Sequence, residues 1–108
     1  MSRRLIIKLK AELDICDARD WHERRRNGLG DDFVQEVDAA LTNIVSAPSR
    51  FMEISPGYRR ALVARFPYLI VFRFDDAEIV VIGVYRASRN PRRWKERIKQ
   101  DRAEQEHE

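Results

Sequence analysis

The residues with the clearest chemical meaning are arginines that crowd the last third of the chain. An apolar run that ends at Val84 is followed by a series of guanidinium groups with one indole among them: Arg86, Arg89, Arg92, Arg93, Trp94 and Arg97. Guanidinium groups stay charged in proteins and bind phosphate or carboxylate through paired hydrogen bonds. An aromatic side chain surrounded by arginines is also typical of a binding hot spot. We therefore predict that this segment binds a phosphate-bearing or acidic macromolecule.

A plainer interpretation stands beside this one. The arginines would then form a solvated basic surface, and Trp94 would cover an edge of the sheet as a core residue. Arg59 and Arg60, at the start of an earlier strand, are interpreted as edge-strand charges that deter aggregation.

Residues for conventional catalysis or metal binding are scarce. The chain has two histidines, His22 and His107, and one cysteine, Cys16. Their spacing fits no zinc site, and no glycine-rich nucleotide loop or nucleophile elbow is present. We therefore expect no metal and no cofactor. His22 lies in line with apolar helix positions and is interpreted as a packed, hydrogen-bonded side chain, and Cys16 as a small buried residue.

Charge is distributed unevenly along the sequence. Residues 11–47 hold four basic and nine acidic side chains, a net charge of −5, whereas residues 48–103 hold thirteen basic and six acidic ones, a net charge of +7. A small protein polarised in this way attracts polyanions on one side. Nucleic acid or an acidic protein segment is therefore the expected partner.

Two helices are expected to position this basic segment by covering one face of a sheet. After a short strand at residues 5–9, the residues Ala11, Ile15, Ala18 and His22 recur with helical spacing. Asn27-Gly28 provides a helix stop, and a second helix follows Gly30-Asp31-Asp32 and ends before Pro48. With so short a connection the two helices must form an antiparallel hairpin.

Three further strands are predicted at residues 58–66, 68–74 and 78–86, whereas residues 51–57 are expected to be irregular. The last strand is apolar at both parities, so both of its faces should be covered. One helical hairpin covers a single face, which leaves the other to the C-terminal segment, a dimer mate or a partner protein. Residues 91 to about 103 are compatible with a C-terminal helix, and residues 104–108 are expected to be a disordered tail. The predicted fold is a single α+β domain over residues 1–108, ordered β-α-α-β-β-β, with the hairpin on one face of a mainly antiparallel sheet.

In this order, several short elements resemble the ParE/RelE superfamily of toxins from bacterial type II toxin–antitoxin modules, and its ParE-like plasmid-stabilisation branch most closely. The elements that carry the resemblance are Gly28-Leu29-Gly30 with Phe33, Arg65-Phe66-Pro67-Tyr68, and Arg89-Asn90-Pro91 with Trp94. Together with the apolar positions of the helices and strands they span roughly residues 5–97. The sequence departs from the usual pattern at two positions, since similar sequences carry tyrosine in place of His22 and histidine in place of Arg86.

One activity that the resemblance implies is metal-free, ribosome-dependent cleavage of mRNA, which inhibits translation. In that reaction basic side chains stabilise the phosphorane, and a neighbouring side chain moves the proton of the 2′-hydroxyl. Here Arg65, Arg73, Arg86 and Arg89 would provide the charge. Arginine does not release its proton, so Arg86 cannot replace the usual histidine as a base. Tyr68 is the remaining candidate base, although its place beside Phe66-Pro67 indicates a structural role.

The other implied activity is that of ParE toxins: binding DNA gyrase and trapping its cleaved DNA complex, which arrests growth. This activity needs a surface rather than an acid–base pair, so we favour it here. The resemblance also implies an acidic antitoxin that wraps the toxin in a heteromeric complex. A third alternative is a non-toxic relic of the fold that still binds antitoxin.

The cellular compartment is inferred from composition. A single cysteine cannot form an intrachain disulfide, and the longest apolar cluster near the N-terminus, Leu5-Ile6-Ile7, is too short for a signal peptide or a membrane span. We therefore expect a cytoplasmic protein that does not associate with a membrane.

Overall fold

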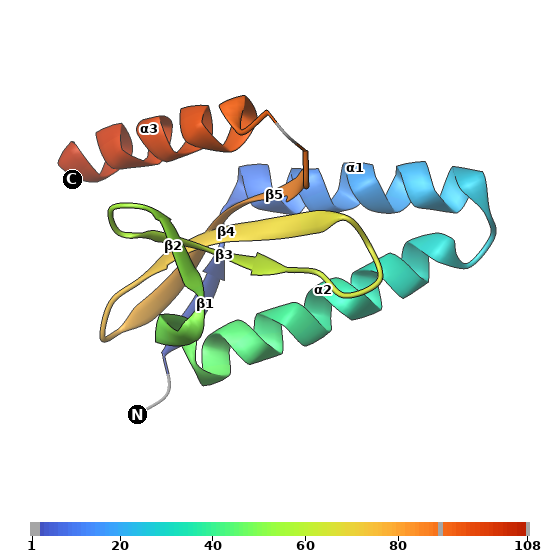
Figure 1. Cartoon of the computed structure of the whole chain (residues 1–108), viewed down its shortest axis with the longest axis horizontal. Coiled ribbons are helices and arrows are strands. Elements are labelled where there is room, and N and C mark those ends of the chain that lie inside the picture. The colour runs from blue at the N-terminus through green and yellow to red at the C-terminus, as the bar shows by residue number, and fades with distance from the viewer. Residues whose placement is uncertain (1–2, 89, 108) are drawn as a thin grey trace.

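The computed structural model describes residues 3–88 and 90–107 as one five-stranded sheet with helices on both faces (Figure 1). The helices are α1 (Leu9–Arg25), α2 (Leu29–Ser46) and α3 (Arg92–Glu106), with a short 3₁₀ helix η1 (Pro48–Arg50) after α2. The strands are β1 (Arg4–Ile7), β2 (Met52–Ser55), β3 (Tyr58–Leu62), β4 (Tyr68–Phe74) and β5 (Glu78–Arg86).

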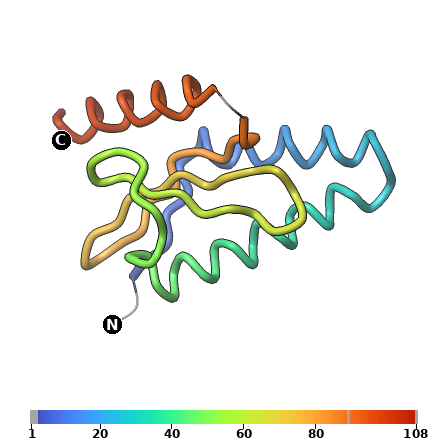
Figure 2. The backbone as a smooth tube through the Cα atoms, viewed as in Figure 1, coloured from blue at the N-terminus to red at the C-terminus, as the bar shows by residue number. Residues whose placement is uncertain are grey.

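The strands follow the spatial order β1-β5-β4-β3-β2. β1 pairs with β5 in parallel, and the other pairs are antiparallel. The backbone trace shows the α1–α2 hairpin on one side and α3 on the other (Figure 2). The predicted α+β fold is therefore confirmed.

Local chemistry explains the turn between α1 and α2. Gly28 has φ of +88°, a left-handed conformation that is easy only for glycine. The carboxylate of Glu23 accepts hydrogen bonds of 3.0 Å from the backbone N–H groups of Gly28 and Gly30. These bonds satisfy two donors at the start of α2 and lower the pKa of Glu23. The turn thus fixes α2 antiparallel to α1.

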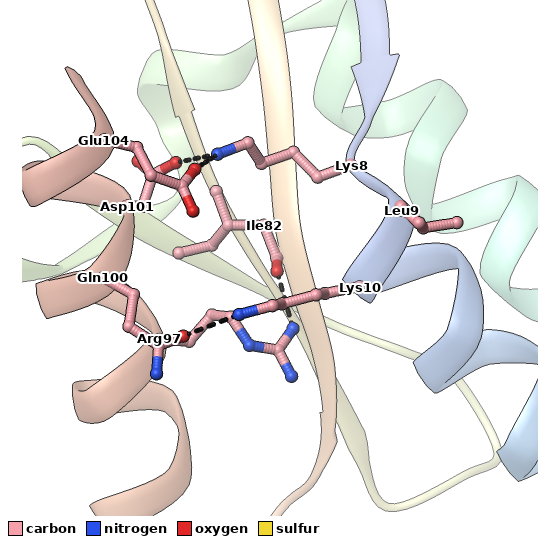
Figure 3. Close-up of a pocket in the computed structure, with 8 residues that line it drawn as sticks. All are labelled: Lys8, Leu9, Lys10, Ile82, Arg97, Gln100, Asp101 and Glu104. Carbon is pink, nitrogen blue, oxygen red and sulfur yellow. Dashed lines mark hydrogen bonds and ion pairs between the residues drawn. The ribbon is translucent and has the colours of Figure 1, made fainter. Parts of the chain in front are cut away.

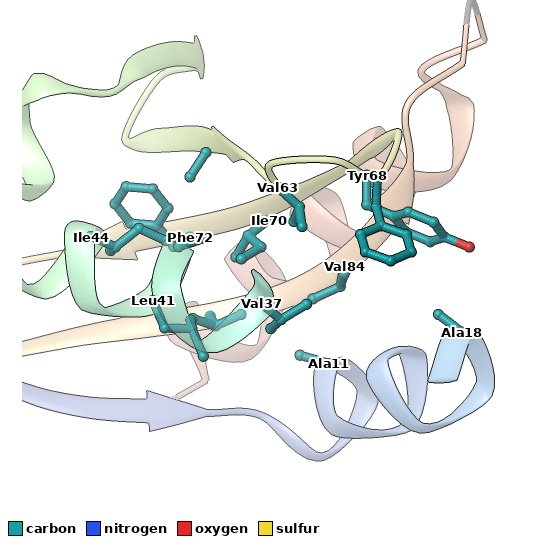
Figure 4. Packing of buried hydrophobic residues seen from close by; sticks show 14 of the residues in the cluster. Ala11, Ala18, Val37, Leu41, Ile44, Val63, Tyr68, Ile70, Phe72 and Val84 are labelled. Carbon is teal, nitrogen blue, oxygen red and sulfur yellow. The ribbon is translucent and has the colours of Figure 1, made fainter. Parts of the chain in front are cut away.

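The main hydrophobic core lies between the hairpin and the sheet (Figure 4). Phe33, Val37 and Ile44 of α2 are almost completely buried against Ile70 and Phe72 of β4. Alternate residues of each strand reach this core, as expected for a pleated sheet with one face covered by helices.

A smaller apolar cluster occupies the opposite face of the sheet, beneath α3. Ile98 of α3 is 2% exposed and packs with Val71, Val80 and Ile82, while Trp94 packs at the margin of the cluster. The sequence left three possibilities for covering this face: the C-terminal segment, a dimer mate or a partner protein. In the structure the C-terminal segment covers it.

Five boundaries differ from the sequence-based prediction. α2 begins at Leu29, with Gly28 as its N-cap, and not after Gly30-Asp31-Asp32. Residues 52–55, expected to be irregular, form β2 because they pair with β3. α1 begins at Leu9 instead of continuing the first strand, and β3 ends at Leu62, where a loop begins in which Arg65 has φ of +69°. α3 continues through the expected tail to Glu106, because Glu104 and Gln105 bond to Lys8 and Tyr58 of the body.

Cys16 was expected to be buried and is instead exposed on α1. Within the described ranges, no helix combines the length and the apolar character needed to cross a membrane.

Candidate functional site

A β-bulge in β5 aims Arg86 at the helical hairpin. Val71 pairs with Gly83 and Phe72 with Val81, so Ile82 is an extra residue on β5. The bulge reverses the alternation of the faces, which directs Tyr85 into the cluster under α3 and Arg86 to the hairpin side. A Cβ atom at Gly83 would overlap the ring of Tyr85. Glycine at this position therefore permits the geometry that places Arg86.

The guanidinium of Arg86 lies over two aromatic rings. It is 5.2 Å from the ring centre of Trp21 on α1 and 5.9 Å from that of Tyr68 on β4. Arg25 contacts the same indole at 4.5 Å. Such cation–π contacts hold a guanidinium in place without neutralising its charge. Trp21 is therefore a member of the site that the sequence pattern did not identify, since its helical position indicated only a flank of the core stripe.

The side chains around Arg86 line an open cavity of about 250 Å³. Its lining comes from α1, from β4 and β5 and from the first turn of α3: Asp14, Asp17, Ala18, Trp21, Tyr68, Val84, Tyr85, Arg86 and Arg93. We call this cavity the Arg86 pocket. Arg86 and Arg93, seven residues apart in the sequence, both line it, as the prediction of a basic cluster requires.

The arginines of this region differ in their electrostatic pairing. Within the described residues, Arg25, Arg86 and Arg93 have no carboxylate at ion-pair distance. Arg97 is instead paired: it donates hydrogen bonds to Asp14 (3.0 Å) and to the carbonyl of Ile82 (2.9 Å). The Arg86 pocket thus contains two arginines without an ion pair among the described residues. Of the two carboxylates in its lining, Asp14 is already bonded to Arg97, and Asp17 is exposed to solvent.

The remaining predicted residues lie outside this pocket. Arg97 is 18% exposed and ties α3 to α1, so it serves the fold. Trp94 is half-buried against the α3 cluster, and Arg92 is exposed beside it on α3. Arg65 lies near Asp32 and Glu36 of α2, at 3.9 and 4.0 Å. Arg89 lies outside the described residues.

Arg73 was a candidate for phosphate binding and is instead neutralised. Its Nε donates to Asp101 of α3 at 2.7 Å, on the sheet face opposite the Arg86 pocket. Asp101 is 2% exposed and also accepts hydrogen bonds from Lys8 at 2.7 Å and from the hydroxyl of Tyr58. Figure 3 shows Lys8 reaching Asp101 and Glu104 across a groove of about 260 Å³ between α1 and α3.

These hydrogen bonds shift the pKa values of Asp101 and Tyr58 in opposite directions. Burial raises the pKa of Asp101, but the hydrogen bonds from Arg73, Lys8 and Tyr58 outweigh it, so that the pKa falls to about 2. Burial and the bond to Asp101 raise the pKa of Tyr58 to about 12. The cluster of Asp101, Arg73, Lys8 and Tyr58 is therefore a fixed ionic anchor for α3 at neutral pH.

His22 lies directly behind the Arg86 pocket, in an aromatic environment. It is 5% exposed, and its ring centre lies 5.2 Å from Phe33, 5.1 Å from Phe66 and 5.5 Å from Tyr68. The packed position expected for His22 is confirmed, but Nε2 has no hydrogen-bond partner among the described residues. Burial, and then the charges of Arg86 and Arg25, lower its pKa, so the imidazole is neutral at pH 7.

We predict that replacing His22 with phenylalanine stabilises the protein by about 1 kcal/mol at neutral pH, because a buried polar atom without a partner is removed. Since the pKa of His22 is lower in the folded than in the unfolded state, acidification below about pH 6.5 favours unfolding. Thermal unfolding at pH 7.5 and 5.5 should show this loss in the wild type and a smaller loss in His22→Phe. Equal losses in both proteins would contradict the prediction.

In the part of the chain that the structure describes, no group of three or more His, Cys, Asp or Glu side chains is placed to hold a metal ion.

Comparisons with known proteins identify related folds and one family. Residues 5–91 match the family described as the ParE toxin of the type II toxin–antitoxin system parDE. Two solved structures with this fold are the chromosomal ParDE system from P. aeruginosa (TM-score 0.68, 21% identity, 81% of this chain and 98% of that one) and a double mutant of E. coli toxin RelE in the free state (TM-score 0.65, 15% identity, 93% and 98%). The same RelE mutant in complex with a peptide of antitoxin RelBc also matches (TM-score 0.57, 15% identity, 89% and 94%). No curated protein sequence matches significantly.

Proposed function

This chain belongs to the ParE toxin family of type II toxin–antitoxin systems, and from this premise we propose that it arrests growth by binding DNA gyrase through the Arg86 pocket. The observation that carries the proposal is that Arg86 and Arg93, which have no ion pair among the described residues, line one pocket beside the half-buried ring of Trp21. Arginine and tryptophan are the residues that most often dominate binding energy at protein interfaces. Contact with a gyrase–DNA complex would use this charge without any proton transfer.

The titratable groups near the pocket favour binding over acid–base chemistry. Burial raises the pKa of Tyr85, whose ring packs under α3, and the lowered pKa of His22 accompanies its enclosure among aromatic rings. Although the ring of Tyr85 lines the pocket, its hydroxyl oxygen is buried, and His22 is 5% exposed, so neither titrating group can reach a substrate there without a rearrangement. A poisoned gyrase complex requires only that the toxin bind.

A second candidate function is ribosome-dependent cleavage of mRNA. It is favoured by one contact, since Tyr68 lines the same pocket as Arg86 and its ring lies 5.9 Å from the guanidinium. In this mechanism Arg86 and Arg93 would hold the scissile phosphate, and the phenol of Tyr68 would handle the proton of the 2′-hydroxyl. The fold shared with RelE is consistent with either candidate.

We also propose that a cognate antitoxin neutralises this toxin in a heteromeric complex. The chain has a net charge of +7 over residues 48–103, and an acidic partner segment would complement the free arginines of the Arg86 pocket. RelE, which shares the fold, is bound by a peptide of its antitoxin. For this chain the antitoxin is inferred from family membership and charge.

The decisive experiment is a side-by-side assay of the purified chain. One arm measures gyrase-dependent cleavage of supercoiled DNA, and the other measures cleavage of mRNA on stalled ribosomes. Trapped gyrase cleavage without mRNA cuts supports the first proposal, whereas codon-phased mRNA cuts without gyrase trapping replace it with the second. Normal growth on induction with neither activity would overturn both and indicate a non-toxic relic.

A further inference from the structure

The outward face of α1 carries apolar side chains that nothing in the described part of the structure covers. Leu9 is 69% exposed and Leu13 is 52% exposed, although large aliphatic side chains usually contribute to a core. Cys16, also exposed, follows them on the same face one turn later. This stripe lies opposite Ala11, Ala18 and His22, by which α1 packs on the sheet. α1 therefore has a second, unpartnered apolar stripe besides the one that faces the core.

The spacing of this stripe is that of a coiled-coil seam. Leu9, Leu13, Cys16 and Asp20 are separated by four, three and four residues, which corresponds to heptad positions d, a, d and a. Asp20 ends the apolar part of the stripe. A helix presenting such a seam packs best against another helix with the same repeat.

The charged residues that flank the seam indicate which helix can pack against it and in which orientation. Lys10 and Asp17 stand at e positions, and Glu12 and Arg19 stand at g positions. Two antiparallel copies bring e beside e and g beside g, so Lys10 meets Asp17 of the second copy and Glu12 meets Arg19. By symmetry each attraction occurs twice.

In a parallel arrangement of two copies, the charges that flank the seam repel each other. Parallel helices bring a g position beside the e position five residues later on the partner, which would oppose Glu12 to Asp17. Like charges at these positions disfavour association. The sequence of α1 is thus complementary to itself in the antiparallel direction only.

We propose that α1 forms a homodimer interface in which the α1 helices of two copies pack antiparallel along Leu9, Leu13 and Cys16. In this packing Leu13 of each copy lies against Cys16 of the other, at the centre of the interface, and Leu9 lies beside Asp20 at each end. The second copy's Asp17 approaches Lys10, whose Nζ lies beside the groove between α1 and α3, bonded to Gln100 at 3.0 Å. The interface is short, so the dimer forms at high protein concentration. The inference does not rest on the gyrase and ribosome proposals, although Asp17 also lines the Arg86 pocket.

The geometry predicts a specific cross-link. With the two-fold axis between Leu13 and Cys16, the two Cys16 residues are offset by three residues, about 4.5 Å along the helix axis, and the axes lie about 8–10 Å apart. Cys16 is the only cysteine of the chain. A short bismaleimide should therefore link two copies at this one position, and mass spectrometry of the digested product should identify a Cys16–Cys16 peptide.

Charge exchange provides the test. Lys10→Asp alone and Asp17→Lys alone should each weaken dimerisation roughly tenfold, because each places two pairs of like charges across the interface. The double variant Lys10→Asp/Asp17→Lys should restore it. Dimerisation is followed by sedimentation equilibrium over a concentration series and by the yield of the cross-link, and circular dichroism checks that each variant is folded.

Leu13→Glu should abolish the dimer, and Leu62→Glu is its matched control. Leu62 lies on β3, away from α1, and is 62% exposed. The proposal would be overturned by a monomer at every concentration, by a cross-link yield insensitive to the charge variants, by a double variant that fails to recover, or by an effect of Leu62→Glu equal to that of Leu13→Glu. Cross-linking of Cys16 to a co-purified antitoxin alone would assign the stripe to that partner instead and overturn the homodimer.

Discussion

Replacing Asp101 with asparagine should destabilise the protein by about 3 kcal/mol and lower its melting temperature by roughly 10 °C. Asp101 is 2% exposed and bonds to Lys8, Arg73 and Tyr58 together. Asparagine keeps the shape but leaves Arg73 without the carboxylate it pairs with, and leaves Lys8 with only the exposed Glu104. Lys8 and Arg73 retain 30% and 21% exposure, so water compensates in part and the loss should fall at the low end for a broken buried pair.

Glu104→Gln is the matched control for this substitution. Glu104 pairs with the same Lys8 but is 55% exposed, so its loss should cost under about 0.5 kcal/mol. Chemical denaturation of both variants gives the two free energies of unfolding. A similar cost for Asp101→Asn and Glu104→Gln would show that the ionic anchor contributes little to the attachment of α3.

The ionic anchor should also make the stability of the protein depend on pH in the acid range. The pKa of Asp101 is about 2 in the folded protein and near 3.8 in the unfolded chain, so the stability it provides is complete above about pH 5. That stability is lost progressively as the pH falls from about 5 towards 2. Asp101→Asn should therefore differ from the wild type at pH 6 and approach it at pH 2.

The apolar periodicity of the sequence predicts most of this fold, because the burial of apolar side chains follows their spacing within each segment. The positions of Phe33, Val37 and Ile44 identify α2, and the two-sided apolar run of β5 indicates a strand covered on both faces. β2 escaped prediction because its existence depends on pairing with β3, a partner that no local pattern specifies. The burial of Asp101 escaped for the same reason, since its partners come from three different strands or strand ends: Lys8, Tyr58 and Arg73.

The candidate site was predictable only in part. The arginine-rich segment identifies Arg86 and Arg93, but helical spacing alone could not separate them from Arg97, which turns inward to Asp14. The bulge at Ile82 decides on which face Arg86 emerges, and a bulge has no strong sequence signal beyond Gly83. Because Arg86 lies on the hairpin side of the sheet, it contacts Trp21 of α1, which makes Trp21 part of the site.

The double substitution Arg86→Ala/Arg93→Ala should abolish growth arrest while the melting temperature stays within a few degrees of the wild type. Both side chains line the Arg86 pocket and have no ion-pair partner among the described residues, so the fold loses little beyond the contact of Arg86 with Trp21, worth about 0.5–1 kcal/mol. A hot-spot arginine contributes about 2 kcal/mol or more to binding. Loss of two should therefore weaken target affinity by at least roughly a hundredfold.

Arg50→Ala is the control for the loss of positive charge. Arg50 is exposed on η1 and belongs to a different cavity, lined by Asn43, Ser46 and Phe51. Induced growth, gyrase trapping and mRNA cleavage are measured for wild type, double variant and control. Arrest that persists in the double variant, or that Arg50→Ala relieves equally, would refute the pocket as the target-binding surface.

Arg86→Lys separates charge from geometry at the same position. Lysine keeps the positive charge but lacks the planar guanidinium that lies 5.2 Å from the Trp21 ring centre and binds anions through paired hydrogen bonds. If stacking on Trp21 orients Arg86 for its target, Arg86→Lys should lose most of the activity that Arg86→Ala loses, and Trp21→Leu should resemble it. If only the positive charge of the pocket matters, the activity of Arg86→Lys should remain close to that of the wild type. The salt dependence of target binding should then also be unchanged.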